Sequence, residues 1–228
     1  IERNRILNNS VGVYTMYSND VVVRDNLIRG QRGPSGYALG FKDSDGLPLV
    51  EKILDATGQK GTGKWTAIEG LNRGVPVSLI GEAVFARYLS TRKAERLQAA
   101  GLLGGTGPSY TGNRAEFIKD LGQALLASKI VSYAQGFSLM RTASAEENWN
   151  INLGATALLW RGGCIIRSSF LQKIKAAFDR RPDLENLLLD DYFAGVLRDS
   201  QAAWRRVVAA GVTAGIPLPS LGAALRRM

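Results

Sequence analysis

The stretch Arg114-Ala-Glu-Phe-Ile-Lys-Asp-Leu-Gly-Gln-Ala-Leu-Leu-Ala-Ser-Lys-Ile-Val-Ser-Tyr-Ala-Gln-Gly-Phe137 decides the fold class of this chain. Its apolar residues recur at the spacing that places them along one face of an α-helix. This period predicts a single long helix from Arg114 to about Ala143 whose apolar face enters a core. The residues of that face are Phe117, Leu121, Leu125, Ile130, Ala134 and Phe137.

The sequence on both sides of this stretch also has helical spacing, from Pro48 to the C-terminus. No strand pattern competes with it there, so we expect an all-α bundle. Thr66-x-x-Glu69 has the form of a capping box and predicts a helix start, and the glycine-rich segment 101–112 predicts a loop. Further helices are expected over 48–57, 76–90, 94–100, 153–160, 165–180 and 192–214, and from Pro219 onward.

Residues 1–45 have a different pattern, an internal repeat of 22 residues. Ile1-Glu-Arg-Asn-Arg-Ile6 recurs as Val23-Arg-Asp-Asn-Leu-Ile28, and a second short apolar run follows each copy, at 11–16 and at 37–41. Short strands, Asn-rich turns and a repeat of this length are typical of a parallel β-helix. We therefore expect a mainly α chain that carries a short N-terminal β segment.

Composition is that of a globular chain and excludes several classes of protein. A chain of 228 residues with 45% apolar residues can bury a core, and no apolar run is long enough to span a bilayer. The net charge is +9, of which residues 1–45 contribute about +1 (six basic against five acidic) and the remainder +8 (23 against 15). The basic pairs Arg205-Arg206 and Arg226-Arg227 have no interleaved aromatic residues, so we expect no nucleic-acid partner.

The single cysteine, Cys164, excludes an internal disulfide and a cysteine metal cluster. We expect Cys164 to be a small buried hydrophobe rather than a reactive thiol. No metal site is therefore predicted.

The segment Gly58-Gln-Lys-Gly-Thr-Gly-Lys-Trp-Thr66 has the composition of a loop that holds a phosphate. Small residues allow the backbone to approach an anion, while the lysines and the hydroxyl supply charge and a donor. A Walker A loop is excluded, because Trp65 stands where the magnesium-binding Ser or Thr should be and because a helix, not a strand, is expected before it. An anion site stays open beside the alternative that Lys60 and Lys64 are ordinary surface lysines.

Several blocks of the sequence carry a resemblance to one family. In their order and spacing they resemble the C-terminal all-helical domain of 6-phosphogluconate dehydrogenase, over about residues 45–225 and well under half of a complete family member. This assigns a helical domain to residues 46–228, truncated at both ends. The blocks are Gly58 to Arg87, Lys129-Ile-Val-Ser-Tyr-Ala-Gln-Gly-Phe137, Arg161-Gly-Gly-Cys-Ile-Ile-Arg167, Asn186-Leu-Leu-Leu-Asp190 and Gly215-Ile-Pro-Leu-Pro219.

A shorter and looser resemblance concerns the N-terminal segment 1–45. Gly12-Val-Tyr-Thr-Met-Tyr-Ser-Asn-Asp20 and Arg32-Gly-Pro-Ser-Gly-Tyr-Ala-Leu-Gly-Phe-Lys-Asp43 resemble the NosD-type periplasmic maturation protein of nitrous oxide reductase. The chain thus resembles two unrelated fragments that join near Lys42-Asp-Ser-Asp-Gly46. The join itself also resembles a lead-in found in the dehydrogenase family.

The dehydrogenase resemblance implies a substrate and a set of site residues. In the family, the positions that match Lys60, Thr62 and Arg87 help to bind the phosphate of 6-phosphogluconate. A lysine charge, a hydroxyl donor and an arginine fork suit a dianion. Lys64 and Trp65 match the motif and are expected to have structural roles. For Glu82, Arg161 and Arg167 the expectation is buried ion pairing.

The resemblance also implies what the retained part lacks. Family members are cytoplasmic homodimers of the pentose phosphate pathway that oxidise 6-phosphogluconate with NADP and decarboxylate the product to ribulose 5-phosphate. The family's general base and acid, a lysine and a glutamate, precede the part retained here, and the sequence contains neither Gly-x-Gly-x-x-Gly nor any histidine. We therefore expect no catalytic residue in this chain, no bound NADP and no activity of the chain alone.

Three functions stay open from the sequence. The first is a fragment of 6-phosphogluconate dehydrogenase that contributes part of the phosphate site and of the dimer core. The second is a NosD-type β-helix maturation or carbohydrate-binding protein. The third is a helical interaction module with a general anion-binding surface. The extent of the resemblance favours the first, with 6-phosphogluconate and a second copy of the chain as partners and neither nucleic acid nor membrane.

Overall fold

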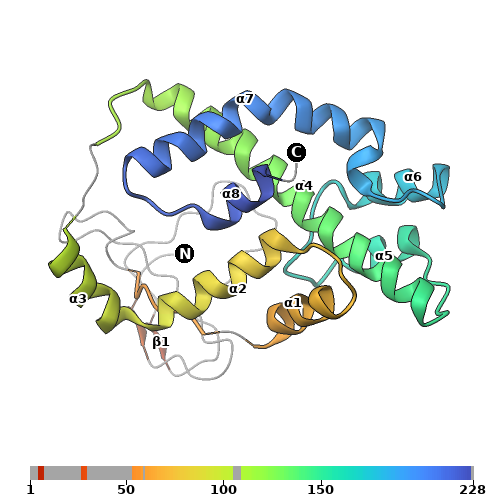
Figure 1. Cartoon of the computed structure of the whole chain (residues 1–228), viewed down its shortest axis with the longest axis horizontal. Helices are drawn as coiled ribbons and strands as arrows, with labels where there is room; N and C mark the ends of the chain where they lie inside the picture. The colour runs from red at the N-terminus through yellow and green to blue at the C-terminus, as the bar shows by residue number, and fades with distance from the viewer. Residues whose placement is uncertain (1–4, 8–26, 30–52, 59, 105–108, 227–228) are drawn as a thin grey trace. The chain divides into compact units, whose positions relative to one another are not determined.

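The chain divides into two compact units, Ile1–Leu54 and Asp55–Met228. The domain boundary predicted at residue 45 lies outside the described residues and stays a prediction. In the part of the chain that is described, no helix combines the length and the apolarity needed to cross a membrane. The structure is a computed structural model, drawn in Figure 1, and it describes residues 5–7, 27–29, 53–58, 60–104 and 109–226.

Two short strands form the described part of the N-terminal unit. Strand β1, Arg5–Leu7, pairs in parallel with β2, Leu27–Arg29. The register places Ile6 opposite Ile28, so paired residues are separated by the 22 residues of the sequence repeat. Parallel pairing at the repeat length is what stacked coils of a β-helix require. The second apolar runs, 11–16 and 37–41, lie outside the described residues.

The regular structure described in the second unit is entirely helical, which confirms the predicted fold class (Figure 1). Most of the expected helices are present with ends within three residues of the prediction. A short 3₁₀ turn, Leu187–Leu189, precedes the last long helix. The helices are α1 Thr62–Asn72, α2 Ser78–Thr91, α3 Lys93–Leu103, α4 Arg114–Glu146, α5 Leu153–Leu159, α6 Leu171–Arg180, α7 Asp191–Thr213 and α8 Pro219–Leu225.

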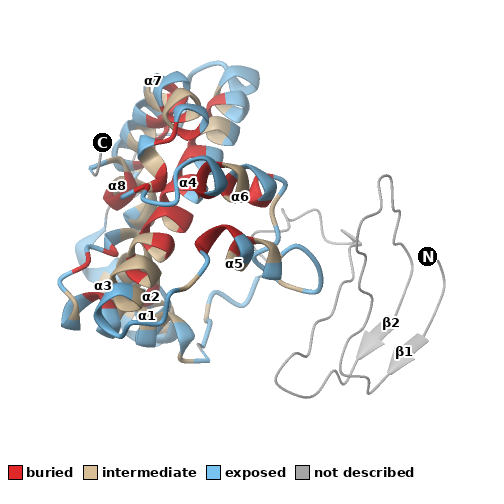
Figure 2. Ribbon diagram, turned by 90° about the vertical axis from the view of Figure 1, so that its right-hand side faces the viewer, coloured by how far each residue is buried: buried red, intermediate tan, exposed pale blue. Residues whose placement is uncertain are grey.

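Helix α4 is the centre of the core, and α1, α2, α5, α7 and α8 pack against it (Figures 1 and 2). It begins at Asn113, whose Oδ1 accepts hydrogen bonds from the backbone N–H of Ala115 (2.9 Å) and of Glu116 (3.1 Å). Its side chains Ile130 and Phe137 are buried against α5, α6 and α7. Helix α7 packs along α4 and buries Trp204 beside it.

The predicted core face of α4 is wrong at one residue. Leu125 is 52% exposed, while its neighbours Ala124 and Ala127 are fully buried. Small residues at these positions let α7 approach α4 closely. Leu125 lies about 100° around the helix from Ala124 and therefore points away from the contact. Apolar spacing alone does not distinguish a leucine at the edge of the face from one at its centre.

The helix predicted over 48–57 is not present in its described portion. Residues 53–58 have no regular secondary structure, and Asp55 has a left-handed backbone with φ 54°. A residue with positive φ cannot continue a right-handed helix. Residues 48–52 lie outside the described residues, so the first half of this predicted helix stays a prediction.

The capping box predicted at Thr66 and Glu69 is also wrong. Helix α1 begins one turn earlier, at Thr62, and Thr66 Oγ1 donates to the Thr62 carbonyl (2.9 Å) inside the helix. Gly61 fixes the earlier start because its left-handed backbone, with φ 102°, cannot belong to a right-handed helix and directly precedes Thr62. Thr66 and Glu69 are therefore interior residues of α1.

Two further boundaries differ from the prediction. Helix α6 begins at Leu171 rather than at residue 165, because the preceding residues form turns that hold Ile165 93% exposed. Helix α3 continues into the predicted loop and ends at Leu103, where Gly104 takes φ 64°. Cys164, expected in the core, is only half-buried.

Candidate anion-binding site

The glycine-rich loop ends where helix α1 begins. Gly61 has φ 102°, which L side chains rarely adopt, and a Cβ there would lie 3.4 Å from the Trp65 ring. The first bond within the helix runs from Trp65 N to the Gly61 carbonyl (2.9 Å). Among the described residues no side chain caps α1, so its first N–H groups are available to an anion.

Arg87, on α2, reaches this loop. Its Nη2 donates a hydrogen bond to the carbonyl oxygen of Gly58, two residues before Lys60. Arg87 is exposed, and a guanidinium has five N–H donors, so donors remain for a ligand. The structure thus brings Arg87 to the loop that carries Lys60 and Thr62, although 27 positions separate Lys60 from Arg87 in the sequence.

Lys60 and Thr62 lie on either side of Gly61 in the sequence. Lys60 is exposed and has no hydrogen bond or ion pair with a described residue. Thr62 is exposed and is the first residue of α1. Lys64 and Trp65, in the first turn of α1, are exposed as well, with the Trp65 ring against Gly61. The lysine charges and the Thr62 hydroxyl on both sides of Gly61 in the sequence are therefore exposed.

The segment before the loop is fixed to α2 and α3 by polar contacts that the sequence did not indicate. Arg96 of α3 donates to the Asp55 carboxylate from Nη1 and Nη2 (both 3.1 Å) and to the Asp55 carbonyl (2.9 Å). Thr57 N donates to Ser90 Oγ (3.1 Å), and the two hydroxyls are 2.9 Å apart. The backbone over 55–58 is thus attached to the C-terminal half of α2 and to α3.

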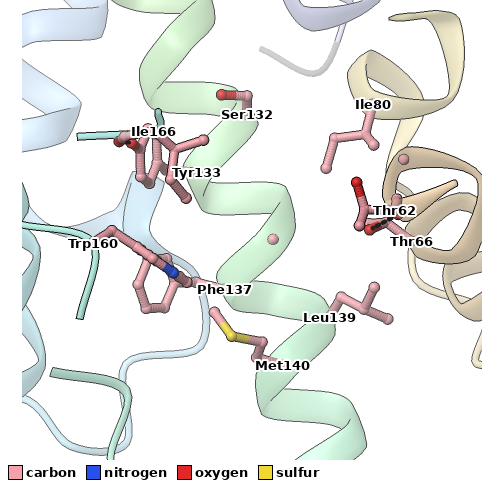
Figure 3. Close-up of a pocket in the computed structure, with 12 residues that line it drawn as sticks. Thr62, Thr66, Ile80, Ser132, Tyr133, Phe137, Leu139, Met140, Trp160 and Ile166 are labelled. Carbon is pink, nitrogen blue, oxygen red and sulfur yellow. Dashed lines mark hydrogen bonds between the residues drawn. The ribbon is translucent and has the colours of Figure 1, made fainter. Parts of the chain in front are cut away.

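A cavity of about 470 Å³ adjoins the start of α1 (Figure 3). Thr62 and Thr66 stand on the α1 side, opposite side chains of α4 and Trp160. The cavity is mostly apolar, with hydroxyl groups at its edge. The sequence did not indicate this cavity, because its apolar lining residues have the same spacing as residues of a packed core.

Tyr133 is the ionisable group of this cavity. Its hydroxyl donates to the carbonyl oxygen of Ile166, which fixes the 160–166 segment against α4. Burial raises the pKa of the Tyr133 phenol, with a smaller contribution from Cys164. Tyr133 therefore stays protonated near neutral pH and does not provide a general base.

Two polar anchors fix α1 and α2 to α4. Arg73, after α1, pairs with Glu146, with Glu147 (2.9 Å) and with Glu69 (3.2 Å). Hydrogen bonds to Glu147 and Glu146 hold the pKa of the Arg73 guanidinium above its ordinary value. Gln135, fully buried on α4, accepts hydrogen bonds at Oε1 from the first N–H groups of α2. The two helices that carry the site thus have fixed positions on the core.

The remaining candidate residues do not join the loop. Arg161 and Arg167 are exposed, so the expectation of buried ion pairing is wrong for them. Glu82 is half-buried and lines a separate hollow with Pro76 and Arg226. The described residues contain no group of three or more His, Cys, Asp or Glu side chains able to hold a metal ion.

Comparison with known proteins gives a consistent result for the helical part. A family profile described as "6-phosphogluconate dehydrogenase, C-terminal domain" matches residues 36–227. The decarboxylating 6-phosphogluconate dehydrogenase of Homo sapiens is 57% identical over 188 residues, which cover 82% of this chain and 39% of the human protein. The decarboxylating 6-phosphogluconate dehydrogenase 2 of Saccharomyces cerevisiae is 56% identical over 189 residues, 82% of this chain and 38% of the yeast protein.

A solved structure is also similar. It is Plasmodium falciparum 6-phosphogluconate dehydrogenase, studied in its apo form, with its cofactor NADP⁺ and with its substrate 6-phosphogluconate. The TM-score is 0.74 at 38% sequence identity, over 78% of this chain and 39% of the Plasmodium chain. The chain thus spans about two-fifths of the length of these relatives. The NosD-type resemblance of residues 1–45 stays a prediction.

Proposed function

The chain belongs to the 6-phosphogluconate dehydrogenase family, and from this premise we propose that its helical unit binds the phosphate end of 6-phosphogluconate. The parent activity is the NADP-dependent oxidation and decarboxylation of 6-phosphogluconate to ribulose 5-phosphate and CO₂ in the cytoplasm. The unit contributes Lys60, Thr62 and Arg87 to the substrate site of such an enzyme. It contributes no general base, no general acid and no dinucleotide-binding loop.

One observation carries this proposal: Arg87 of α2 donates to the Gly58 carbonyl, at the loop that leads to the uncapped start of α1. This contact supports the proposal because it holds the Arg87 guanidinium against the loop that carries Lys60 and leads to Thr62 at the start of α1. A phosphate dianion is the ligand that uses all four kinds of donor, the guanidinium, the ammonium, the hydroxyl and the helix N–H groups. A carboxylate would use fewer of them, because it has two oxygens instead of three.

The binding energy of such a site comes from charge-assisted hydrogen bonds. Each contributes on the order of 1.5–3 kcal/mol in an enclosed site. The present loop is open to solvent, where screening reduces each contribution. We therefore expect measurable but weak binding of inorganic phosphate by this chain, and stronger binding of 6-phosphogluconate where further contacts to the sugar acid exist.

The direct test is a titration of the purified chain with inorganic phosphate, followed by NMR or calorimetry. Lys60→Ala and Arg87→Ala should each weaken binding. Arg198→Ala, an exposed arginine on α7, removes the same charge far along the sequence and serves as the matched control. Equal loss in the Arg198 variant, or none in the two site variants, contradicts the proposal.

The proposed lack of activity has a test of its own. NADP and 6-phosphogluconate are incubated with the purified chain, and NADPH absorbance is followed. No increase over a control without protein is expected, because the family resemblance assigns neither the base nor the acid to a residue of this chain. An NADPH-forming activity that copurifies with the chain contradicts this part of the proposal.

A homodimer is the second proposed feature of the parent enzyme. Ile118, Leu125 and Leu126 form an exposed apolar stripe on α4, at the i, i+7 and i+8 spacing of one helix face. Exposed stripes of this kind mark association surfaces. Sedimentation should show a dimer for the chain and a larger monomer fraction for Leu125→Glu, while the exposed Leu71→Glu on α1 serves as the control.

A further inference from the structure

Arg96 makes a set of contacts that its own helix does not need. Its Nε donates to the Leu89 carbonyl and its Nη2 to the Ser90 carbonyl, each at 3.2 Å, at the C-terminal end of α2. The other side of the guanidinium holds the carboxylate and the carbonyl of Asp55. One side chain of α3 thus joins the end of α2 to the segment that leads into the anion-binding loop.

Asp55 is a residue that needs such support. Its φ of 54° is left-handed, a conformation that costs a non-glycine residue free energy and persists only where surrounding contacts fix it. Aspartate tolerates this conformation better than most residues do. Arg96 satisfies the carbonyl and the carboxylate of Asp55 together, so it favours this backbone conformation over an extended one.

The next residues along the chain, Thr57 and Gly58, are also attached to α2. Thr57 is bonded to Ser90 and Gly58 to Arg87, so residues 55, 57 and 58 each touch the C-terminal half of α2 or α3. Lys60 and Thr62 come directly after this attached stretch. The position of Asp55 therefore determines how the next residues approach α1 and Arg87.

Stability alone does not account for the pair. The side chains of Arg96 and Asp55 are 30% and 56% exposed, and ion pairs at such exposure contribute little to the free energy of unfolding. The planar guanidinium holds three backbone carbonyls and one carboxylate together, a geometry that an exposed ion pair does not require for its small contribution to stability. This combination is typical of a positioning contact.

We propose that Arg96 is a positioning residue, which fixes the backbone of residues 55–58 and thereby aligns Lys60 and Thr62 with Arg87 for a phosphate. The inference rests on the proposed function of the loop. Arg96 itself does not touch the anion. Its effect on binding passes through the Asp55 backbone.

The experiment compares Arg96→Ala with Arg92→Ala in the full chain. Arg92 lies four residues away and is exposed, and its partner is Glu95 rather than the loop, so the control removes the same charge from the same region. Hydrogen exchange of the 56–62 backbone should accelerate about tenfold in Arg96→Ala and stay unchanged in Arg92→Ala. The dissociation constant for inorganic phosphate should rise about fivefold in the first variant only.

Two further variants separate positioning from a general loss of structure. Arg96→Lys keeps the charge but not the fork, and it should behave like Arg96→Ala. In a Thr62→Ala background, Arg96→Ala should weaken phosphate binding less than it does in the parent, because the two residues act through one loop. A purely structural role predicts equal weakening in both backgrounds. If Arg96→Ala does not fold, Asp55→Asn, which keeps one acceptor and tolerates positive φ, takes its place.

Each outcome decides between the inference and the proposed function. Unchanged exchange of the 56–62 backbone in both Arg96→Ala and Asp55→Asn contradicts the positioning role, whatever the phosphate affinity. If exchange accelerates in Arg96→Ala but the parent chain binds no phosphate, the proposed function is contradicted. The purpose assigned to Arg96 is then contradicted as well. Accelerated exchange together with weaker, non-additive phosphate binding supports both.

Discussion

The loop over residues 55–62 and the buried face of α4 are held by opposite kinds of contact. The described residues of the loop are mostly exposed, and the loop is fixed by hydrogen bonds with Arg87, Ser90 and Arg96. The α4 face is buried among apolar side chains such as Phe193 and Trp204 of α7. We therefore expect anion binding and stability to depend on separate regions of this unit. Substitutions should therefore change one property with little effect on the other.

The largest effect is expected in the core. Phe193, fully buried on α7, packs edge to face with Phe170 at a ring distance of 6.2 Å. Phe193→Ala should lower the free energy of unfolding by about 3–5 kcal/mol, because it leaves a cavity. The affinity of the folded fraction for phosphate should not change. Denaturant unfolding measures the first quantity.

Phe85→Ala is the matched control for that substitution. Phe85 is 70% exposed on α2, so removal of its ring should change the free energy of unfolding by less than about 0.5 kcal/mol. Equal destabilisation by the two variants would show that the helical core described here is not the one that stabilises the chain.

A smaller loss of stability is expected at the contact between α4 and the start of α2. Gln135 of α4 accepts from Leu79 N (3.1 Å) and Ile80 N (3.4 Å), and its Nε2 donates to Ser78 Oγ (3.2 Å). Gln135→Leu leaves two N–H groups at the start of α2 without a partner and should cost about 1–3 kcal/mol. Gln135→Glu keeps the acceptor and should cost less. Thermal unfolding of both variants checks the order.

In the loop, a substitution at Gly61 should change phosphate affinity more than it changes the free energy of unfolding. Gly61→Ala places a Cβ at φ 102° and should cost about 1 kcal/mol of stability. It should weaken phosphate binding more than Gly58→Ala does, because a Cβ at Gly58 meets no atom within 4 Å. Unchanged binding in Gly61→Ala would mean that the start of α1 does not contact the anion.

The smallest effect concerns pH. Two hydrogen bonds from Arg206, at 2.6 and 2.7 Å, hold the pKa of the Asp120 carboxyl below its ordinary value. A lowered pKa stabilises the folded state above the unfolded value of about 3.9, and this stability is lost as pH falls through the folded value. The difference in unfolding free energy between parent and Asp120→Asn should therefore shrink below about pH 4. A pH-independent difference contradicts this origin.

The helices could be predicted because their apolar spacing reports burial. Ile130, Ala134 and Phe137 were assigned to the core from that spacing, and they are buried. The spacing could not show that α7 passes close enough to exclude Leu125. It also could not show where α1 begins, because the break at Gly61 depends on a backbone conformation and not on a pattern of side chains.

The site was predicted less completely. Lys60, Thr62 and Arg87 were assigned through the family resemblance, and the contact between Arg87 and Gly58 brings their segments together. The pair of Asp55 and Arg96 was missed, because exposed polar contacts between residues 41 positions apart leave no periodic signal. The expected helix over 48–57 also concealed the turn at Asp55.

A structure of this chain bound to 6-phosphogluconate tests the central claim most directly. The account predicts phosphate oxygens within hydrogen-bonding distance of Lys60 Nζ, Thr62 Oγ1 and the Arg87 guanidinium, at the start of α1. Arg96 should remain on Asp55 in that complex. A phosphate held at another basic surface, such as Arg205 and Arg206, with the 55–62 loop empty, would contradict the account.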